Sequence, residues 1–182
     1  MWNCRELGIL GTVQELSCLV REKDPLVLFV VESGLDKARL KVLRCQFHFS
    51  SKLVVPRREQ GGGLVMFWKQ EAHVSIKSFS HHRINAIIDE GATNPWCLTG
   101  FYGAPETHRR HESWSLLQLL HGQYNLSWCC MGDFNELLSY EEKQGGPIPS
   151  HRQMQDFREA IDFCALKIWV LLAPHLPGVT TV

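Results

Sequence analysis

A short segment, WCCMGDFNELL from Trp128 to Leu138, places acidic and amide side chains directly after an apolar run. The polar residues are Asp133, Asn135 and Glu136. An apolar run that ends in this way predicts a buried strand followed by a loop. A sheet holds the residues at its strand ends rigidly while loops leave them accessible, so such residues commonly line functional sites in α/β folds. These side chains are therefore the first candidates for chemistry.

Other polar side chains occupy comparable positions. Glu32 ends the apolar run LVLFVV, Tyr102 ends the run WCLTGF, and Asn3 lies near the start of the chain. An unpaired carboxylate is costly to bury, and a hard cation with oxygen ligands would offset that cost. Mg²⁺ typically takes one or two protein carboxylates and keeps several waters, and Glu32 with Asp133 meets that count.

The neutral side chains add further chemistry. The Asn135 amide could orient a water or a phosphate oxygen without adding charge repulsion, and the Tyr102 hydroxyl could donate to a phosphate. The alternative for each residue alone is an ordinary loop position beyond a strand, but several such residues together favour a site. The histidines of SHHR (80–83) and HRRH (108–111) have no evident third ligand, so they indicate polar surface rather than a metal site.

Hydrophobic periodicity predicts the elements that position these residues. Apolar faces at helical spacing predict helices over 11–25, 36–47, 112–122 and 150–166. Short apolar or alternating runs predict strands over 26–31, 64–69, 73–79, 83–89, 96–103 and 127–134. The strands between 64 and 103 are spaced like an antiparallel meander. The whole pattern predicts one mixed α/β domain.

Capping-box spacing predicts where two of the helices begin. Thr12 with Glu15 has this spacing in the first helix, and Ser150 with Gln153 has it in the last. In the third helix, the residues expected to face the core are Leu116, Leu119 and Leu120.

Composition limits the classes of protein. Of 182 residues, 45% are hydrophobic and 21% are charged, as in a globular domain with a core of its own. The sequence has neither the roughly 20 apolar residues of a membrane helix nor the apolar core of a signal peptide, so we expect a nuclear or cytoplasmic protein. Seven cysteines without a CxxC pair indicate free thiols. With 19 basic and 19 acidic residues, net charge alone argues weakly against nucleic-acid binding. The basic clusters at 56–59 and 108–111 are expected to be solvated loops.

Several blocks, in order, resemble one family. MWNCRELG resembles the opening WNCRGLG of plant non-LTR (LINE-type) retrotransposon endonucleases, and LVLFVVESGL resembles their ILFLMETKL. The blocks GGGLVMFWK, WCLTGFYGAPETHRRHESWSLL and WCCMGDFNELLSYEEKQGG match further along. The resemblance covers Trp2 to about Leu166, and the combination of blocks is specific although GDFN alone is not.

The resemblance implies a fold and a chemistry. These enzymes belong to the endonuclease/exonuclease/phosphatase superfamily, which implies a four-layer α/β sandwich of two mixed sheets with helices outside. It also implies hydrolysis of DNA phosphodiester bonds with Mg²⁺ or Mn²⁺. By position, Glu32 would bind the metal together with the Asn3 amide, and Tyr102 would contact the phosphate. Asp133 would orient or deprotonate the attacking water, and Asn135 would hold both in place.

Two features depart from the family pattern. Fewer residues than usual precede Trp2, and the family's C-terminal Ser-Asp-His motif is missing, so we expect a domain over 1–167 that is truncated at both ends. Residues 168–182, IWVLLAPHLPGVTTV, do not match the family's continuation. If suitable codons are assumed for these residues, restoring one base before them shifts the reading frame, and the new frame encodes DLGFTGPPFTWCNN, which does match. We therefore expect an aberrant, frameshifted tail over 168–182.

Three functions remain open. The retained site residues favour an active Mg²⁺-dependent endonuclease that nicks target DNA for a retrotransposon. The two chain ends favour a decayed fragment with weak or no activity. A phosphatase of the same superfamily is the third possibility. We expect DNA as the partner, no membrane association, and a monomer.

Overall fold

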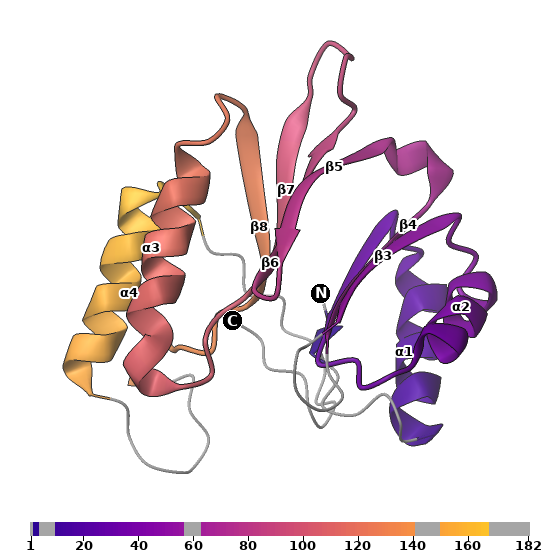
Figure 1. Ribbon diagram of the computed structural model, residues 1–182, viewed down its shortest axis with the longest axis horizontal. Coiled ribbons are helices and arrows are strands. Elements are labelled where there is room, and N and C mark those ends of the chain that lie inside the picture. The colour runs from indigo at the N-terminus through magenta and orange to yellow at the C-terminus, as the bar shows by residue number, and fades with distance from the viewer. Residues whose placement is uncertain (1, 4–9, 57–62, 141–149, 168–182) are drawn as a thin grey trace.

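Four layers make up the molecule, two sheets face to face with a pair of helices outside each (Figure 1). The computed structural model describes residues 2–3, 10–56, 63–140 and 150–167. Its strands are β1 (Trp2–Asn3), β2 (Val27–Val31), β3 (Ser51–Pro56), β4 (Gly63–Trp68), β5 (Val74–Ser80), β6 (Arg83–Ile88), β7 (Trp96–Tyr102) and β8 (Ser127–Asp133). Its helices are α1 (Leu10–Lys23), α2 (Lys37–Gln46), α3 (Arg110–His121) and α4 (His151–Phe163), with 3₁₀ turns η1 (Gln70–Ala72) and η2 (Thr107–Arg109).

Both sheets are mixed. The first has the order β1-β2-β4-β3, in which only β1 and β2 run parallel. The second has the order β5-β6-β7-β8, in which only β7 and β8 run parallel. The predicted sandwich of two mixed sheets flanked by helices is therefore confirmed.

Three apolar clusters fill the spaces between the four layers. Since each sheet is covered on both faces, its strands read as nearly continuous apolar runs, as VLFVV does in β2. The first cluster, between the first sheet and helices α1 and α2, includes Leu16, Leu40 and Phe67. The second cluster lies between the two sheets and includes Phe29, Met66 and Leu98. The third, between the second sheet and helices α3 and α4, includes Phe101, Leu117 and Phe157.

Of the two capping boxes predicted at helix starts, one is confirmed and one is wrong. The capping box of α4 is confirmed: the Ser150 hydroxyl accepts from the Gln153 amide N–H at 3.3 Å, and the Gln153 side chain accepts from the Ser150 N–H at 3.2 Å. The capping box predicted for the first helix is wrong. Because α1 begins at Leu10, Thr12 lies inside the helix and cannot cap it.

Strand assignments needed two corrections. The sequence prediction missed β3, which pairs with β4 along its whole length. It also joined β4 to the meander, whereas β4 belongs to the first sheet and only β5, β6 and β7 form the meander. The chain passes from one sheet to the other through η1, which directly follows β4. Alternation within a strand cannot reveal which sheet the strand joins.

The inward face of α3 also differs from the prediction. Leu120 is buried as expected and Leu116 packs against the core, but Leu119 is 68% exposed. The buried positions of α3 are instead Ser113, Trp114, Leu117 and Leu120, which recur at helical spacing.

The cysteines of the described residues are free thiols, as predicted. Burial raises the pKa of the Cys97 and Cys164 thiols, which keeps them protonated and unreactive near neutral pH. No helix among the described residues is long and apolar enough to cross a membrane. The predicted tail over 168–182 and the basic residues Arg57 and Arg58 lie outside the described residues.

Candidate active site

The ends of three strands bring the predicted site residues to one end of the sandwich. Tyr102 ends β7 and Asp133 ends β8, and the two are partners in the parallel register of these strands. Glu32 directly follows β2. In the first sheet, Asn3 is the register partner of Val31, so the backbone of Asn3 lies beside the residue that precedes Glu32.

A hydrogen bond joins the two sheets at this end. The Tyr102 hydroxyl donates to Glu32 Oε1, from the last residue of β7 to the residue after β2. β8 also contacts both β1 and β2 across the sandwich. Five residues predicted to form the site, Asn3, Glu32, Tyr102, Asp133 and Asn135, are thus gathered by the fold although they are spread over most of the sequence.

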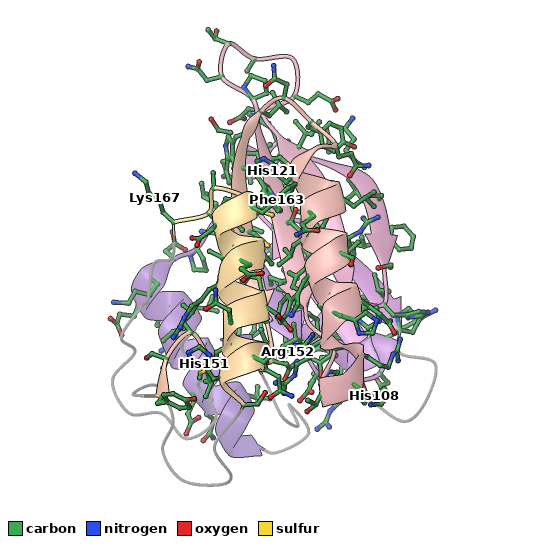
Figure 2. All side chains as sticks on the ribbon, turned by 90° about the vertical axis from the view of Figure 1, so that its left-hand side faces the viewer. His108, His121, His151, Arg152, Phe163 and Lys167 are labelled. Carbon is green, nitrogen blue, oxygen red and sulfur yellow. The ribbon has the colours of Figure 1, made fainter. Side chains whose placement is uncertain are left out.

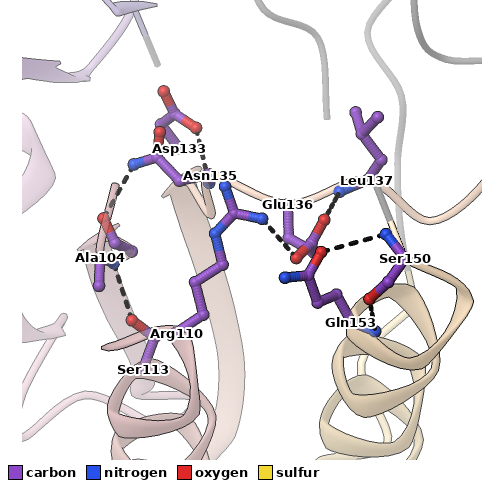
Figure 3. Close-up of polar contacts among 10 residues, drawn as sticks. Ala104, Arg110, Ser113, Asp133, Asn135, Glu136, Leu137, Ser150 and Gln153 are labelled. Carbon is purple, nitrogen blue, oxygen red and sulfur yellow. Dashed lines mark hydrogen bonds and ion pairs between the residues drawn. The ribbon is translucent and has the colours of Figure 1, made fainter. Parts of the chain in front are cut away.

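The turn after β8 is held by its own polar groups. The Asn135 backbone N–H donates to Asp133 Oδ1 at 2.9 Å, and the Asn135 side-chain amide donates to the Gly103 carbonyl at 2.8 Å (Figure 3). The Gly103 N–H in turn donates to the Asp133 carbonyl at 2.8 Å. Asn135 has a φ of +55°, a left-handed conformation that asparagine tolerates better than most residues. These bonds fix the Asp133 carboxylate relative to the end of β7.

Gly132 permits this close approach of the two strands. A Cβ atom at Gly132 would lie 1.8 Å from the carbonyl oxygen of Phe101 in β7, a distance no side chain could occupy. The glycine that precedes the acid in the GDFN segment is therefore required by strand packing.

The sequence pattern places Glu136 among the polar residues after the strand but indicates no role for it, and it predicts a solvated loop at Arg110. Arg110 is the first residue of α3, and its Nη1 lies 2.6 Å from Oε2 of Glu136, the residue after Asn135. The Glu136 side chain is only 1% exposed. The segment HRRH is therefore not simply the solvated loop that the sequence predicted. Helical spacing holds a signal for this, because Arg110 precedes the buried residues Trp114 and Leu117 by four and seven positions.

Oxygen ligands of the kind that Mg²⁺ prefers lie at this end. The Glu32 and Asp133 carboxylates, with a neutral amide oxygen from Asn135, suit a hard cation that takes one or two carboxylates and keeps several waters. No group of three or more His, Cys, Asp or Glu residues in the described ranges could hold a metal ion. Carboxylate and amide oxygens suit Mg²⁺ or Mn²⁺, whereas zinc more often takes Cys and His ligands.

Basic side chains surround this end of the second sheet. Figure 2 shows α3 and α4 side by side, with His108 near the start of α3 and His151 and Arg152 at the start of α4. All three side chains are exposed. Because α3 follows β7 and α4 follows β8, both helices begin near the ends of the strands that carry Tyr102 and Asp133.

The fold is similar to several solved structures, whereas the amino-acid sequence matches no family model and no curated protein. An AP endonuclease from Leishmania major aligns with a TM-score of 0.67 and 14% identity, over 90% of this chain and 65% of that one. A 3′ phosphatase from Neisseria bound to a product DNA hairpin aligns with a TM-score of 0.61 and 14% identity, over 89% of this chain and 69% of that one. An AP endonuclease from Archaeoglobus fulgidus gives a TM-score of 0.61 and 13% identity, over 90% and 68% of the two chains.

The chain has the endonuclease/exonuclease/phosphatase fold. It spans about two thirds of the length of these three proteins, and 65% of the leishmanial one. The endonuclease/exonuclease/phosphatase fold includes both endonucleases and a phosphatase among these neighbours, so the reaction must be argued from the site rather than from the fold.

Proposed function

We propose that this chain is a metal-dependent phosphodiester hydrolase that nicks DNA. The observation that carries the proposal is the gathering of Glu32, Tyr102 and Asp133 at one end of two sheets, with the Tyr102 hydroxyl bonded to Glu32. The AP endonuclease neighbours support the reaction class. The resemblance to retrotransposon endonucleases further suggests target-site nicking that exposes a 3′ hydroxyl for reverse transcription.

Each residue has a role that its surroundings support. Glu32, with the Asn3 amide, would hold Mg²⁺ or Mn²⁺, and the bound ion would neutralise charge on the phosphate and the leaving oxygen. Asp133 would orient or deprotonate the attacking water. Its carboxylate is held by the Asn135 N–H, so Asn135 would act chiefly by fixing Asp133.

The Tyr102 hydroxyl has a single hydrogen to donate, and in this structure it forms a hydrogen bond with Glu32. It could therefore donate to a substrate phosphate only after it leaves Glu32. The exposed basic residues His108, His151 and Arg152 would face the DNA backbone near the site. Of these, Arg152 supplies a fixed positive charge in a chain whose formal net charge is zero.

The test is nicking of supercoiled plasmid by the purified full chain, with Mg²⁺ and with a chelator. We expect nicking with Mg²⁺ that Asp133→Asn reduces at least about 100-fold, because the base for water is lost. Asp162→Asn, at an exposed position near the far end of α4, is the matched control and should nick normally. Nicking that survives chelation, or that Asp133→Asn leaves intact, would contradict the proposal.

Assays on the same purified chain also distinguish two other functions. If a folded chain nicks no DNA with either metal, the non-catalytic remnant is favoured. The neisserial neighbour, a 3′ phosphatase, favours release of phosphate from DNA ends as the second candidate. An oligonucleotide with a 3′ phosphate, offered beside the plasmid, would lose phosphate without internal cleavage in that case.

A further inference from the structure

We propose that the buried Arg110–Glu136 ion pair positions the catalytic turn Asp133–Asn135. This inference rests on the proposed function, because it assigns a role to residues that support the same site. Figure 3 shows the Arg110 side chain reaching from α3 toward Glu136, past the turn that carries Asp133 and Asn135. Glu136 is joined to Asn135 by one peptide bond, so a shift of one moves the other.

The segment after the catalytic turn is held from two helices. From α3, Arg110 binds the Glu136 carboxylate at 2.6 Å, and that carboxylate also accepts from the Leu137 N–H at 3.0 Å. From α4, the Arg158 side chain donates to the Leu138 carbonyl at 2.7 Å. The start of α3 is itself tied to the end of β7, because the Ser113 hydroxyl accepts from the Ala104 N–H at 2.8 Å. The turn thus keeps a fixed relation to α3, α4 and β7.

Glu136 is 1% exposed and Arg110 is 19% exposed, and this degree of burial makes stability a poor explanation for the pair. Removing two charges from water is costly, and a buried ion pair can often be replaced by apolar residues of similar size without loss of stability. The buried Nε atom of Arg110 has no hydrogen-bond partner within the described part of the chain, so the pair is not fully compensated. The pair can instead fix the position of the Glu136 carboxylate, because the charge-assisted bond from Arg110 Nη1 to Oε2 ties it to the start of α3.

A neighbouring pair supplies a matched control. Arg109 binds Glu112 at 2.9 Å in the first turn of α3, but these side chains are 42% and 50% exposed. The hydrogen bond from Arg109 lowers the pKa of Glu112, and within the described part of the chain these two side chains bond to each other rather than to the catalytic turn. Glu112→Gln and Glu136→Gln therefore make the same chemical change in the partners of two adjacent arginines, Glu112 outside and Glu136 inside the proposed network.

The first readout is plasmid nicking by the full-length variants with Mg²⁺. We expect Glu136→Gln to lower kcat by about tenfold to a hundredfold while KM stays nearly unchanged, because the water-activating group is misplaced and the DNA surface is not. Arg110→Gln should have a similar effect, and the double variant should be little worse than either single one, because the two residues act as one pair. Glu112→Gln should keep the wild-type kcat.

The second readout does not depend on activity. Amide hydrogen exchange over residues 133–138 should be about tenfold faster in Glu136→Gln, and unchanged in Glu112→Gln, because the turn loses its anchor. If the wild-type chain nicks no DNA, the proposed function fails, and hydrogen exchange still decides whether the pair holds the turn. Equal exchange in the two variants would overturn the inference.

An apolar replacement separates positioning from folding. Arg110→Met combined with Glu136→Leu removes both charges while filling the space, so we expect thermal stability near or above that of the wild type. Its kcat should remain as low as that of Glu136→Gln, because apolar side chains fill the space but form no directional bond that holds the turn in place. A stable double variant with wild-type kcat would show that the ion pair has no positioning role.

Discussion

A hydrogen bond joins Tyr102 and Glu32, to which the sequence assigned different roles. Glu32 was expected to bind a metal and Tyr102 to contact a phosphate, yet in the structure they are partners. The bond spans the two sheets, so it also holds the site end of the sandwich together. Tyr102 itself is buried, at 6% exposure, and packs in the cluster between the sheets.

Tyr102→Phe tests this bond. Loss of the hydroxyl should lower the free energy of unfolding by about 1 kcal/mol, since a hydrogen bond to a carboxylate is lost while the ring stays packed. Under the proposed function, it should also slow Mg²⁺-dependent nicking. Urea denaturation and the plasmid assay measure the two effects. Tyr140→Phe, at an exposed position, should change neither. An unchanged stability in Tyr102→Phe would mean that the bond contributes nothing in solution.

α3 illustrates how an element joins the core to the site. One face buries Trp114 and Leu117 in the cluster between the second sheet and α3 and α4. The first residue of the helix, Arg110, reaches Glu136 in the segment after β8. Because the same face of α3 packs in the core and carries Arg110, an error in locating that face also misplaces Arg110. The sequence prediction chose Leu119, which points to solvent, and overlooked Leu117, which is fully buried.

Leu117→Ala and Leu119→Ala make the same change on the two sides of α3. We expect Leu117→Ala to lower the free energy of unfolding by about 2–5 kcal/mol, because it leaves a cavity beside Phe101 and Phe157. Leu119→Ala should change it by less than about 0.5 kcal/mol, because its side chain is 68% exposed. Urea denaturation of both variants decides the matter. Equal losses would contradict the assigned face.

At the scale of the whole molecule, the distance between the two sheets determines how the core packs. Gly100 in β7 faces Phe29 in β2, and a Cβ atom added at Gly100 would lie 2.5 Å from the Phe29 ring. The ring is fully buried and cannot turn aside without disturbing the cluster between the sheets. Because Glu32 and Tyr102 lie at the ends of these same strands, the spacing of the sheets also determines whether they can meet.

Gly100→Ala should therefore destabilise the protein by about 1–3 kcal/mol through overpacking. Gly11→Ala is the matched control. A Cβ atom at Gly11 meets nothing within 4 Å and the residue lies in α1, so alanine should raise the free energy of unfolding by about 1 kcal/mol. Opposite signs in urea denaturation are expected. A neutral Gly100→Ala would indicate that the sheets can separate at this point.

Local interactions let the sequence determine the helices, most strands and the residues at their ends. The apolar run LVLFVV, the Ser150–Gln153 capping box and the change from apolar to polar at Gly132-Asp133 each depend on neighbours in the chain. The candidate site residues Glu32, Tyr102, Asp133 and Asn135 were proposed by the same means, since each ends or follows a strand. Their gathering in one site was expected from their positions at strand ends and from the resemblance to a family, but which strands would bring them together was not.

Tertiary structure alone decided which strands pair and which charged residues are buried. It placed β4 in the first sheet, added β3 beside it, bonded Tyr102 to Glu32, and chose Arg110 rather than Arg109 for the buried pair with Glu136. Strand pairing and burial are contacts between residues far apart in the chain, and their energies depend on the partner rather than on the local pattern. Two adjacent arginines look alike in the sequence, and only the packed layers make one of them structural.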